Sequence, residues 1–209
     1  MQILAHRGFW EHAEEKNSAA ALRRALAEGY GVETDLRDAA QRLVIAHDPA
    51  GPGALAAEDF FALYRETQSG AALALNMKAD GLRGLLKSLL QREGIKNYFC
   101  FDMSVPEMLG YAREGLRFFT RESEFEPAPT LYAEAAGVWV DMFQGDWVQA
   151  RDVAKHLDAG KQVALVSPEL HRRPHLDFWA RLRAAGLGAN DNLLLCTDYP
   201  RAARDFFHG

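Results

Sequence analysis

The chain has 209 residues and a mass of 23.3 kDa, with 48% hydrophobic and 25% charged residues. This composition is typical of a soluble globular protein and predicts a single domain over residues 1–209. The net charge of −5 disfavours nucleic acid as a partner, and no apolar run approaches the ~20 residues of a membrane span.

The start of the chain and its two cysteines favour a cytoplasmic location. The first strand-like run begins at Gln2, which leaves no room for a signal peptide. Cys100 and Cys196 each lie inside an apolar run, as small core residues do, and a disulfide scaffold is not expected. We therefore expect a cytoplasmic protein without stable membrane insertion. The sequence leaves its oligomeric state open.

Short apolar runs of β type alternate with helix-like segments along the chain. The predicted strands are residues 3–6, 31–36, 73–78, 98–102, 116–120, 137–142, 162–167 and 193–197. The predicted helices are residues 18–28, 80–92, 105–114, 148–159, 174–185 and 200–207. A further run at 43–48 is predicted to form a hairpin with the second strand. Eight such strands predict the α/β class with a (β/α)₈ TIM-type barrel, near the lower size limit of that fold.

Two local features complete this prediction. Asn17 stands where the N-cap of the first helix belongs, and Gly29 suits the position just past its end. Four histidines are expected at the surface without a role: His12, His156, His175 and His208.

Polar residues stand at the carboxyl end of each predicted strand, where barrel enzymes build their active sites. Several of them lie inside the apolar run and not after it, which is unusual for residues that only end a strand. In chain order they are His6-Arg7-Gly8, Glu33 and Asp35, Asn76 and Lys78, Asp102, Arg121, Asp141, Glu169 and His171, and Asp198.

Glu33 and Asp35 are two residues apart on one strand, so their carboxylates share a face. Two adjacent carboxylates raise each other's pKa unless a cation lies between them. A solvated or salt-bridged pair would fit the same pattern. Arg7 and Lys78, at neighbouring strand ends, favour a Mg²⁺ or Ca²⁺ ion beside a pocket in which the guanidinium and the ammonium bind phosphate.

His6 and His47 stand at the ends of neighbouring predicted strands. A lone histidine is more often a packed or surface residue. Two histidines beside a metal and an anion pocket form a natural acid–base pair near neutral pH.

Together these residues resemble the glycerophosphodiester phosphodiesterase family, which belongs to the barrel phosphodiesterases that include phosphatidylinositol-specific phospholipase C. The resemblance is strongest over residues 3–48 and returns at 73–78 and 196–200. It is carried by "AHRG", "EKNS", "VETD", "VIAHD", a strand that ends in Lys78, and "TDYP". It implies that His6 and His47 are the general acid and base, that Glu33 and Asp35 hold a divalent cation, and that Arg7 and Lys78 contact the phosphate.

The sequence departs from the family pattern in two places. "LNMK" has Asn76 where the family has a third metal carboxylate, which removes one negative charge; an amide oxygen can still bind the cation. Glu169, expected among the substrate-binding residues, or Asp102 could replace the missing charge. Second, His47 and Lys78 are only 31 positions apart, too close for the inserted subdomain of many family members, which places glycerol specificity in question.

The sequence therefore predicts a phosphoric diester hydrolase that acts on a small-molecule phosphodiester of glycerophosphodiester or related lipid or sugar type. It is expected to need one divalent cation, Mg²⁺ or Ca²⁺, bound by Glu33, Asp35 and Asn76. The alternative is a barrel that binds a phosphorylated sugar or lipid headgroup without turning it over. Asn76 would then mark a decayed metal site. Intact His6, His47, Glu33 and Asp35 disfavour that alternative, because a decayed site has no reason to keep its acid–base pair.

Overall fold

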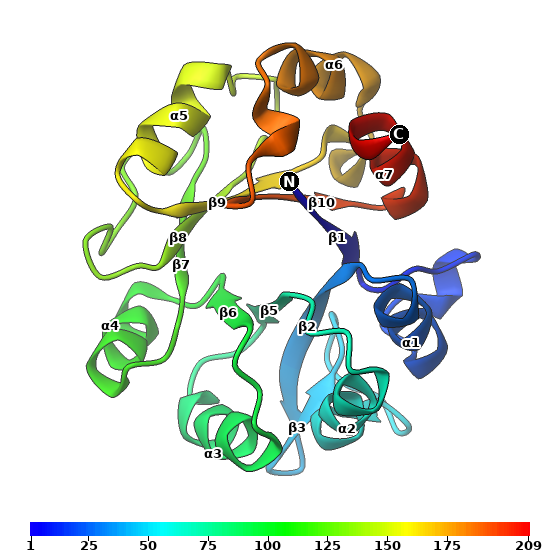
Figure 1. The fold of residues 1–209 in the computed structure, drawn as a ribbon. Coiled ribbons are helices and arrows are strands. Elements are labelled where there is room, and N and C mark those ends of the chain that lie inside the picture. Colours follow the sequence, from blue (N-terminus) through cyan, green and yellow to red (C-terminus); the bar gives the residue numbers. More distant parts are fainter. The chain divides into compact units, whose positions relative to one another are not determined.

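The computed structural model describes residues 1–209 (Figure 1). By its internal contacts the chain divides into two compact units, residues 5–118 and residues 119–209 with 1–4, and each is described by itself. The assignment of residues 1–209 to a single domain stays a prediction. None of the helices has the length and apolar character needed to cross a bilayer.

The sheet of residues 5–118 is built around strand β2. β2 pairs in parallel with β5 and antiparallel with β3; β5 pairs in parallel with β6, and β4 extends the hairpin beyond β3. β1 is the other neighbour of β2. The strands are β1 (Gln2–His6), β2 (Gly31–Ala39), β3 (Arg42–Ile45), β4 (Leu55–Ala56), β5 (Leu73–Met77) and β6 (Tyr98–Phe101).

Four α-helices cover one side of this sheet, as Figure 1 shows. They are α1 (Ala19–Ala27), α2 (Ala57–Thr67), α3 (Arg83–Glu93) and α4 (Val105–Glu114), and a short 3₁₀ turn, η1 (Ala13–Glu15), precedes α1. Their apolar stripes pack on the strands through fully buried side chains such as Leu22, Phe60 and Leu86.

Residues 119–209 form a parallel sheet in the order β7-β8-β9-β10, with the first residues of β1 beside β10. Its strands are β7 (Phe119–Glu122), β8 (Gly137–Val140), β9 (Gln162–Val166) and β10 (Leu193–Thr197). Its helices are α5 (Ala150–Asp158), α6 (Leu176–Ala184) and α7 (Pro200–His208), with 3₁₀ turns η2 (Pro168–His171) and η3 (Leu187–Ala189).

Burial on both faces explains why these strands could be recognised from the sequence as apolar runs. All five residues of β5 and all five of β10 are buried, as are the first six of β2. Parallel strands covered on both faces are nearly continuous apolar runs, because neither face meets water. The polar residues of β2, Glu33 to Asp35, break this rule.

The structure corrects three sequence predictions. Helix α2 and the short β4 were not predicted; α2 begins without a side-chain cap at Ala56, and only the acidic Glu58 and Asp59 of its first turn mark its start. β7 was placed at 116–120 but spans Phe119–Glu122, because buried Glu122 reads as a loop residue. The predicted hairpin is confirmed, and its turn at Ala40 and Gln41 has positive φ at both positions.

His156 was expected at the surface, and this prediction is wrong. Its side chain is buried on α5, where Nε2 lies 2.6 Å from Glu122 Oε2 and Nδ1 lies 2.9 Å from Tyr132 Oη. Lys155 Nζ contacts the second oxygen of Glu122 at 2.5 Å. Burial lowers the pKa of His156, although the Glu122 carboxylate partly opposes this effect.

Glycine is the only residue type that fits position 8, in the turn between β1 and α1. Its φ is +90°, and a Cβ at this position would lie 2.7 Å from the backbone carbonyl carbon of Ala21. The next residue, Phe9, donates its N–H to Ala21 O at 2.9 Å, so the turn is held against α1. Both the left-handed backbone and the close approach therefore require glycine.

We expect Gly8→Ala to lower the free energy of unfolding by about 2–5 kcal/mol, because the left-handed backbone strain and the clash with Ala21 add. Gly29→Ala is the matched control, since Gly29 has φ +80° and no atom within 4 Å of the added Cβ. It should cost only about 1–2 kcal/mol. Urea unfolding measures both values; equal losses would show that the Ala21 contact is not tight.

Candidate active site

The candidate site lies in residues 5–118, at the carboxyl ends of β1, β2 and β5. Glu33 and Asp35 point to the same face of β2 and are almost fully buried, with 2% and 0% of their surface exposed. In the parallel register Asp35 is opposite Asn76 of β5, so the amide of Asn76 joins this face. Lys78, two residues after Asn76, follows on the same side. The pairing of β2 with β5 thus brings together residues 41 positions apart.

Three side chains hold the carboxylate of Asp35. Arg7 Nε lies 3.0 Å from Oδ2, Lys78 Nζ lies 3.2 Å from Oδ1, and Asn17 Nδ2 donates a hydrogen bond to Oδ2 at 2.8 Å. Both cation contacts are ion pairs and not directed hydrogen bonds, since Arg7 Nε and Asp35 Oδ1 lack a hydrogen-bond partner. Two positive charges thus lie against the single charge of Asp35, and both also act on the neighbouring Glu33.

Glu33 is less well compensated than Asp35. Its Oε2 accepts a 3.3 Å hydrogen bond from Arg7 N and lies 3.8 Å from His6 Nε2. Burial and the neighbouring charge of Asp35 raise the pKa of Glu33 to about 8, against the opposing effect of Arg7 and Lys78. The pair is therefore unequal: one carboxylate is neutralised by ion pairs, whereas the other is short of positive charge.

The backbone after β1 aims Arg7 and His6 at this pair. Arg7 has a left-handed conformation with φ 57°, its N–H donates to Glu33 O at 2.8 Å, and its carbonyl accepts from Asn17 N at 2.9 Å. Trp10 Nε1 donates to the carbonyl of His6 at 3.1 Å. The strained turn is thus tied to β2 on one side and to the start of α1 on the other.

Asn17 was predicted as the N-cap of the first helix, and this prediction is wrong. The cap is Ser18, whose Oγ accepts from Ala21 N. Asn17 has φ 63° and uses its amide to bridge the site: Nδ2 donates to Asp35, and Oδ1 accepts from Thr34 Oγ1 at 2.8 Å. The sequence signal for both roles is the same, because asparagine tolerates left-handed backbone and also caps helices.

Two oxygens of the site are buried without a hydrogen-bond donor: Asp35 Oδ1 and Asn76 Oδ1. No group of three or more His, Cys, Asp or Glu side chains is placed to hold a metal ion. The oxygen atoms available to a cation here belong to the carboxylates of Glu33 and Asp35 and to the amide of Asn76. All three are hard oxygen donors, so they fit Mg²⁺ or Ca²⁺, whose other positions are usually filled by water and substrate phosphate.

His47 follows β3 and lines a cavity of about 570 Å³ that Arg7 and Asn17 also line. Its ring is 45% exposed, and Nδ1 lies 2.9 Å from Asp48 Oδ1. Of the predicted residues, His6, Arg7, Glu33, Asp35, Asn76 and Lys78 gather around the buried pair. His47 borders the same site through this cavity.

Glu169 belongs to the other unit, in the turn after β9. Ser167 Oγ donates to its carboxylate, as do Thr197 Oγ1 at 2.5 Å and Asp198 N at 3.1 Å. These local partners account for its burial. A part for Glu169 in substrate binding stays a prediction, as does the suggestion that Asp102 supplies the missing charge.

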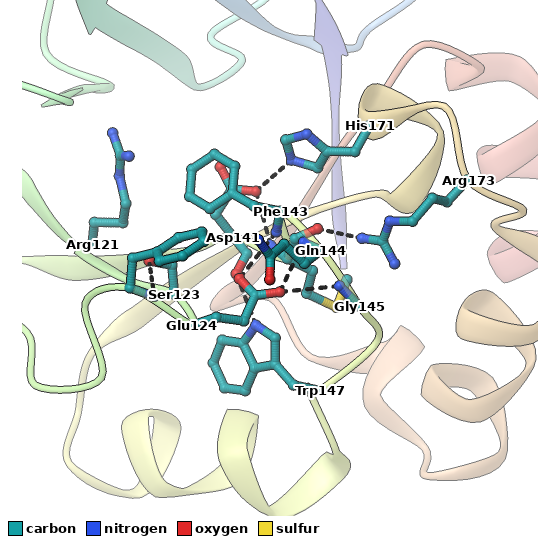
Figure 2. A network of polar contacts seen from close by, with 12 residues as sticks. Arg121, Ser123, Glu124, Asp141, Phe143, Gln144, Gly145, Trp147, His171 and Arg173 are labelled. Atoms are coloured by element: carbon teal, nitrogen blue, oxygen red, sulfur yellow. Dashed lines mark hydrogen bonds and ion pairs between the residues drawn. The ribbon is translucent and has the colours of Figure 1, made fainter.

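Figure 2 shows a second polar cluster, within residues 119–209, around the loop that follows β8. Asp141 Oδ1 lies 2.6 Å from His171 Nε2, and His171 packs on the ring of Phe143 at 5.1 Å between centroids. Glu124 accepts hydrogen bonds from three successive backbone N–H groups, residues 143–145, at 3.0–3.1 Å. Nothing in the sequence indicated Glu124, because its partners are backbone groups about twenty positions away.

The hydrogen bonds to Glu124 affect its titration. Partial burial by itself would raise the pKa of this carboxyl, but the three loop N–H donors and the N–H of Glu124 itself together outweigh burial and leave the pKa below its ordinary value. Figure 2 shows Arg121 beside the same loop, with its guanidinium 5.6 Å from the Phe143 ring. We read the cluster as the anchor of the β8 loop.

Asn17→Gly should lower the free energy of unfolding by about 1–2 kcal/mol, because Asp35 and Thr34 lose their hydrogen bonds to the amide. Glycine keeps the left-handed backbone accessible. Asn17→Ala, the comparison variant, should lose more, since alanine adds backbone strain at φ 63°. Chemical denaturation measures both. Wild-type stability of the glycine variant would mean that the amide bridge contributes nothing.

Comparison with known proteins gives matches to solved structures only. No protein-family model matches the chain, and no curated protein does. The crystal structure of a glycerophosphodiester phosphodiesterase from Agrobacterium tumefaciens matches with a TM-score of 0.72 and 16% identity, over 100% of both chains. One from Parabacteroides distasonis matches with a TM-score of 0.71 and 16% identity, over 99% of this chain and 96% of that chain.

A phosphodiesterase from Oleispira antarctica, solved in complex with the product sn-glycerol-3-phosphate, matches with a TM-score of 0.71 and 16% identity. The match covers 100% of this chain and 97% of that chain. These full-length matches confirm the predicted α/β class of (β/α)₈ TIM-barrel type. The chain has the fold of the glycerophosphodiester phosphodiesterases.

Proposed function

We propose that the protein is a phosphoric diester hydrolase that uses one divalent cation, Mg²⁺ or Ca²⁺, and a pair of histidines. The observation that carries the proposal is the buried Glu33–Asp35 pair, with Arg7 and Lys78 in contact with Asp35 and His6 Nε2 3.8 Å from Glu33. A purely structural salt-bridge network would neutralise both carboxylates, whereas this network neutralises only Asp35. The shared fold of glycerophosphodiester phosphodiesterases supports the same reaction, and the product in the Oleispira structure supports a small-molecule substrate.

Arg7 and Lys78 are the proposed phosphate ligands. Both are largely shielded from water, with 22% and 19% of their side chains exposed, so their attraction for an anion is less screened than at an open surface. Arg7 presents a planar fork of donors and Lys78 a compact charge, a combination suited to a phosphodiester monoanion. Asp35, in contact with both, holds them in place.

Glu33, Asp35 and Asn76 are the proposed ligands of the cation. Their two charges and one amide oxygen give a weaker site than three carboxylates would. When bound, the cation supplies Lewis-acid polarisation of a phosphoryl oxygen and a lower pKa for the attacking hydroxyl. The positive charge would also relieve the repulsion between the two buried carboxylates, which the ion pairs of Asp35 relieve only in part.

His6 and His47 are the proposed acid and base. His6 contacts the electron-rich side of the pair at Glu33, which orients its ring, and His47 is oriented by Asp48 through Nδ1. When the Nδ1–H of His47 donates this hydrogen bond to Asp48, the lone pair on Nε2 is available to accept a proton. One imidazole takes the proton of water or of a substrate hydroxyl next to the phosphate, and the other protonates the departing alkoxide.

A barrel that binds a phosphorylated sugar or lipid headgroup without turnover is the alternative, and it would need the anion pocket but not the histidines. Hydrolysis of bis(p-nitrophenyl) phosphate and of a glycerophosphodiester, with Mg²⁺, with Ca²⁺ and after chelation by EDTA, separates the two. We expect turnover that EDTA abolishes and one of the two metals restores.

Replacing His6 or His47 by alanine should lower kcat by roughly 10²–10⁴, because each loses one proton-transfer group, and should leave the unfolding midpoint nearly unchanged. His12→Ala is the matched control, since His12 is exposed and outside the site. Steady-state rates on the same substrate measure the effect. A variant with wild-type turnover would exclude that histidine as acid or base.

Asn76→Glu should tighten Mg²⁺ or Ca²⁺ binding in the substrate-free protein, because charge count strongly sets affinity for hard cations. It need not raise activity, since the added charge competes for Arg7 and Lys78. Isothermal titration calorimetry measures the affinity, with Glu33→Gln as the opposite change, expected to weaken it. Unchanged affinity in the Asn76 variant would place its side chain outside the coordination shell.

A further inference from the structure

Two side chains outside the proposed chemistry hold the backbone of the proposed acid and base. Trp10 Nε1 donates to the carbonyl of His6 at 3.1 Å, and the guanidinium of Arg37 donates to the carbonyl of His47 at 3.0 Å. Neither Trp10 nor Arg37 is a proposed ligand of the cation or of the phosphate. Each histidine thus has a donor of its own, and both donors belong to the unit of residues 5–118.

Arg37 lies two residues after Asp35 on β2, so it continues the row of Glu33 and Asp35 on one face of the strand. Its side chain is half-buried and forms no ion pair, and its one hydrogen-bond partner is His47 O. The Nε of Arg37 is buried without a partner. Because a buried charge without a carboxylate lowers stability, a salt bridge does not explain this arginine. Its one directed contact is with the backbone that carries His47.

His47 depends on such a contact, because it lies just past the paired part of β3. The ladder between β2 and β3 ends with the hydrogen bond from Ala46 N to Asp35 O at 3.0 Å. The carboxylate of Asp48, which contacts Nδ1 of His47, is 89% exposed, so it orients the ring but restrains the backbone little. The hydrogen bond from Arg37 fixes the backbone of His47 to the strand that carries the buried carboxylates.

His6 has a matching position at the end of β1. The next residue, Arg7, has a left-handed backbone with φ 57°, so the chain changes direction directly after His6. The Trp10 indole reaches back four residues across this turn to the carbonyl of His6. The centre of its ring also lies 4.4 Å from Lys16 Nζ. Any aromatic ring can make that contact, whereas only the indole N–H can hold the carbonyl.

We propose that Trp10 and Arg37 are positioning residues, Trp10 for His6 and Arg37 for His47. This inference rests on the proposed function, in which the two histidines move protons. Proton transfer depends steeply on geometry, and a displacement of about 1 Å can cost roughly 10²-fold in rate. A hydrogen bond to the main chain limits such a displacement without touching the substrate. Its loss should therefore lower kcat and leave KM unchanged.

The test crosses two substitutions, each of which removes one donor, with the two histidine variants. Trp10→Phe and Arg37→Met should each lower kcat on a glycerophosphodiester about 10-fold, with KM within about 2-fold of wild type. Trp10→Phe should lower kcat no further in His6→Ala, because the ring that it positions is absent, and should keep its full effect in His47→Ala. Arg37→Met should show the reverse pattern. Arg37→Lys keeps a donor and should restore most of the rate.

The matched controls remove the same kinds of donor from main-chain carbonyls of residues 119–209. Trp147 Nε1 donates to Asp141 O at 3.0 Å, and the guanidinium of Arg183 donates to Phe206 O at 3.3 Å. Trp147→Phe and Arg183→Met should lower the unfolding midpoint as much as the test variants do, with kcat within about 2-fold of wild type. Equal falls of kcat in the controls would reduce the effect to a general loss of stability and overturn the inference.

A second measurement does not need turnover. The ring carbon–proton NMR signals of His6 and His47, each assigned from its alanine variant, report the surroundings of each imidazole. Trp10→Phe should move the signal of His6 and not that of His47, and Arg37→Met should do the reverse. Signals that stay in place in both variants would contradict the inference.

The inference and the proposed function fail in different ways. If the wild type hydrolyses a glycerophosphodiester or bis(p-nitrophenyl) phosphate but the crossed pattern is absent, the inference is wrong and the proposed function stands. The same holds if Arg37→Met raises KM and leaves kcat unchanged, because Arg37 would then contact the substrate. If neither substrate is hydrolysed with Mg²⁺ or with Ca²⁺, the proposed function itself fails, and the inference with it.

Discussion

Two carboxylates buried side by side on β2 are the constraint on which the rest of the site depends. Burying Glu33 and Asp35 in a parallel strand is costly unless positive charge and hydrogen-bond donors reach them. Three features of the chain supply these partners: the left-handed turn at Arg7, the left-handed Asn17 before α1, and the placement of Lys78 by the register of β5. The glycine after Arg7 then lets the turn pack against α1.

The positive charges are distributed unevenly over the two buried carboxylates. This uneven distribution favours a catalytic role for the pair over a purely structural one. Asp35 has two cations and an amide, whereas Glu33 has one backbone N–H and a distant imidazole. Asn76 brings an amide oxygen without a donor to the same face. A purely structural network would spread its cations over both acids, because an unpaired buried charge lowers stability. A site for a cation and an anionic substrate leaves room for both charges, and this arrangement is consistent with that use.

Residues 119–209 use the same residue types differently. Glu124 and His171 have their partners in the loop after β8, Asp141 pairs with His171 from the turn after β9, and Glu122 has its partners on α5. Glu169 is likewise held by hydroxyl and N–H groups of its own unit. Polar residues at strand ends therefore serve as anchors of loops as well as members of a site. The two uses differ in whether the donors around a carboxylate satisfy its hydrogen-bonding capacity and its charge.

The sequence by itself determined the strands, the hairpin and the cluster of His6, Arg7, Glu33, Asp35, Asn76 and Lys78, because buried parallel strands are apolar runs and these polar residues interrupt or end them. It could not determine helix α2 and the short β4, nor the true end of β7, whose buried Glu122 depends on partners from α5. Asn17 and His156 were misjudged for the same reason. Each is defined by contacts with residues 17 to 34 positions away, and only the tertiary structure decides which distant group meets a side chain.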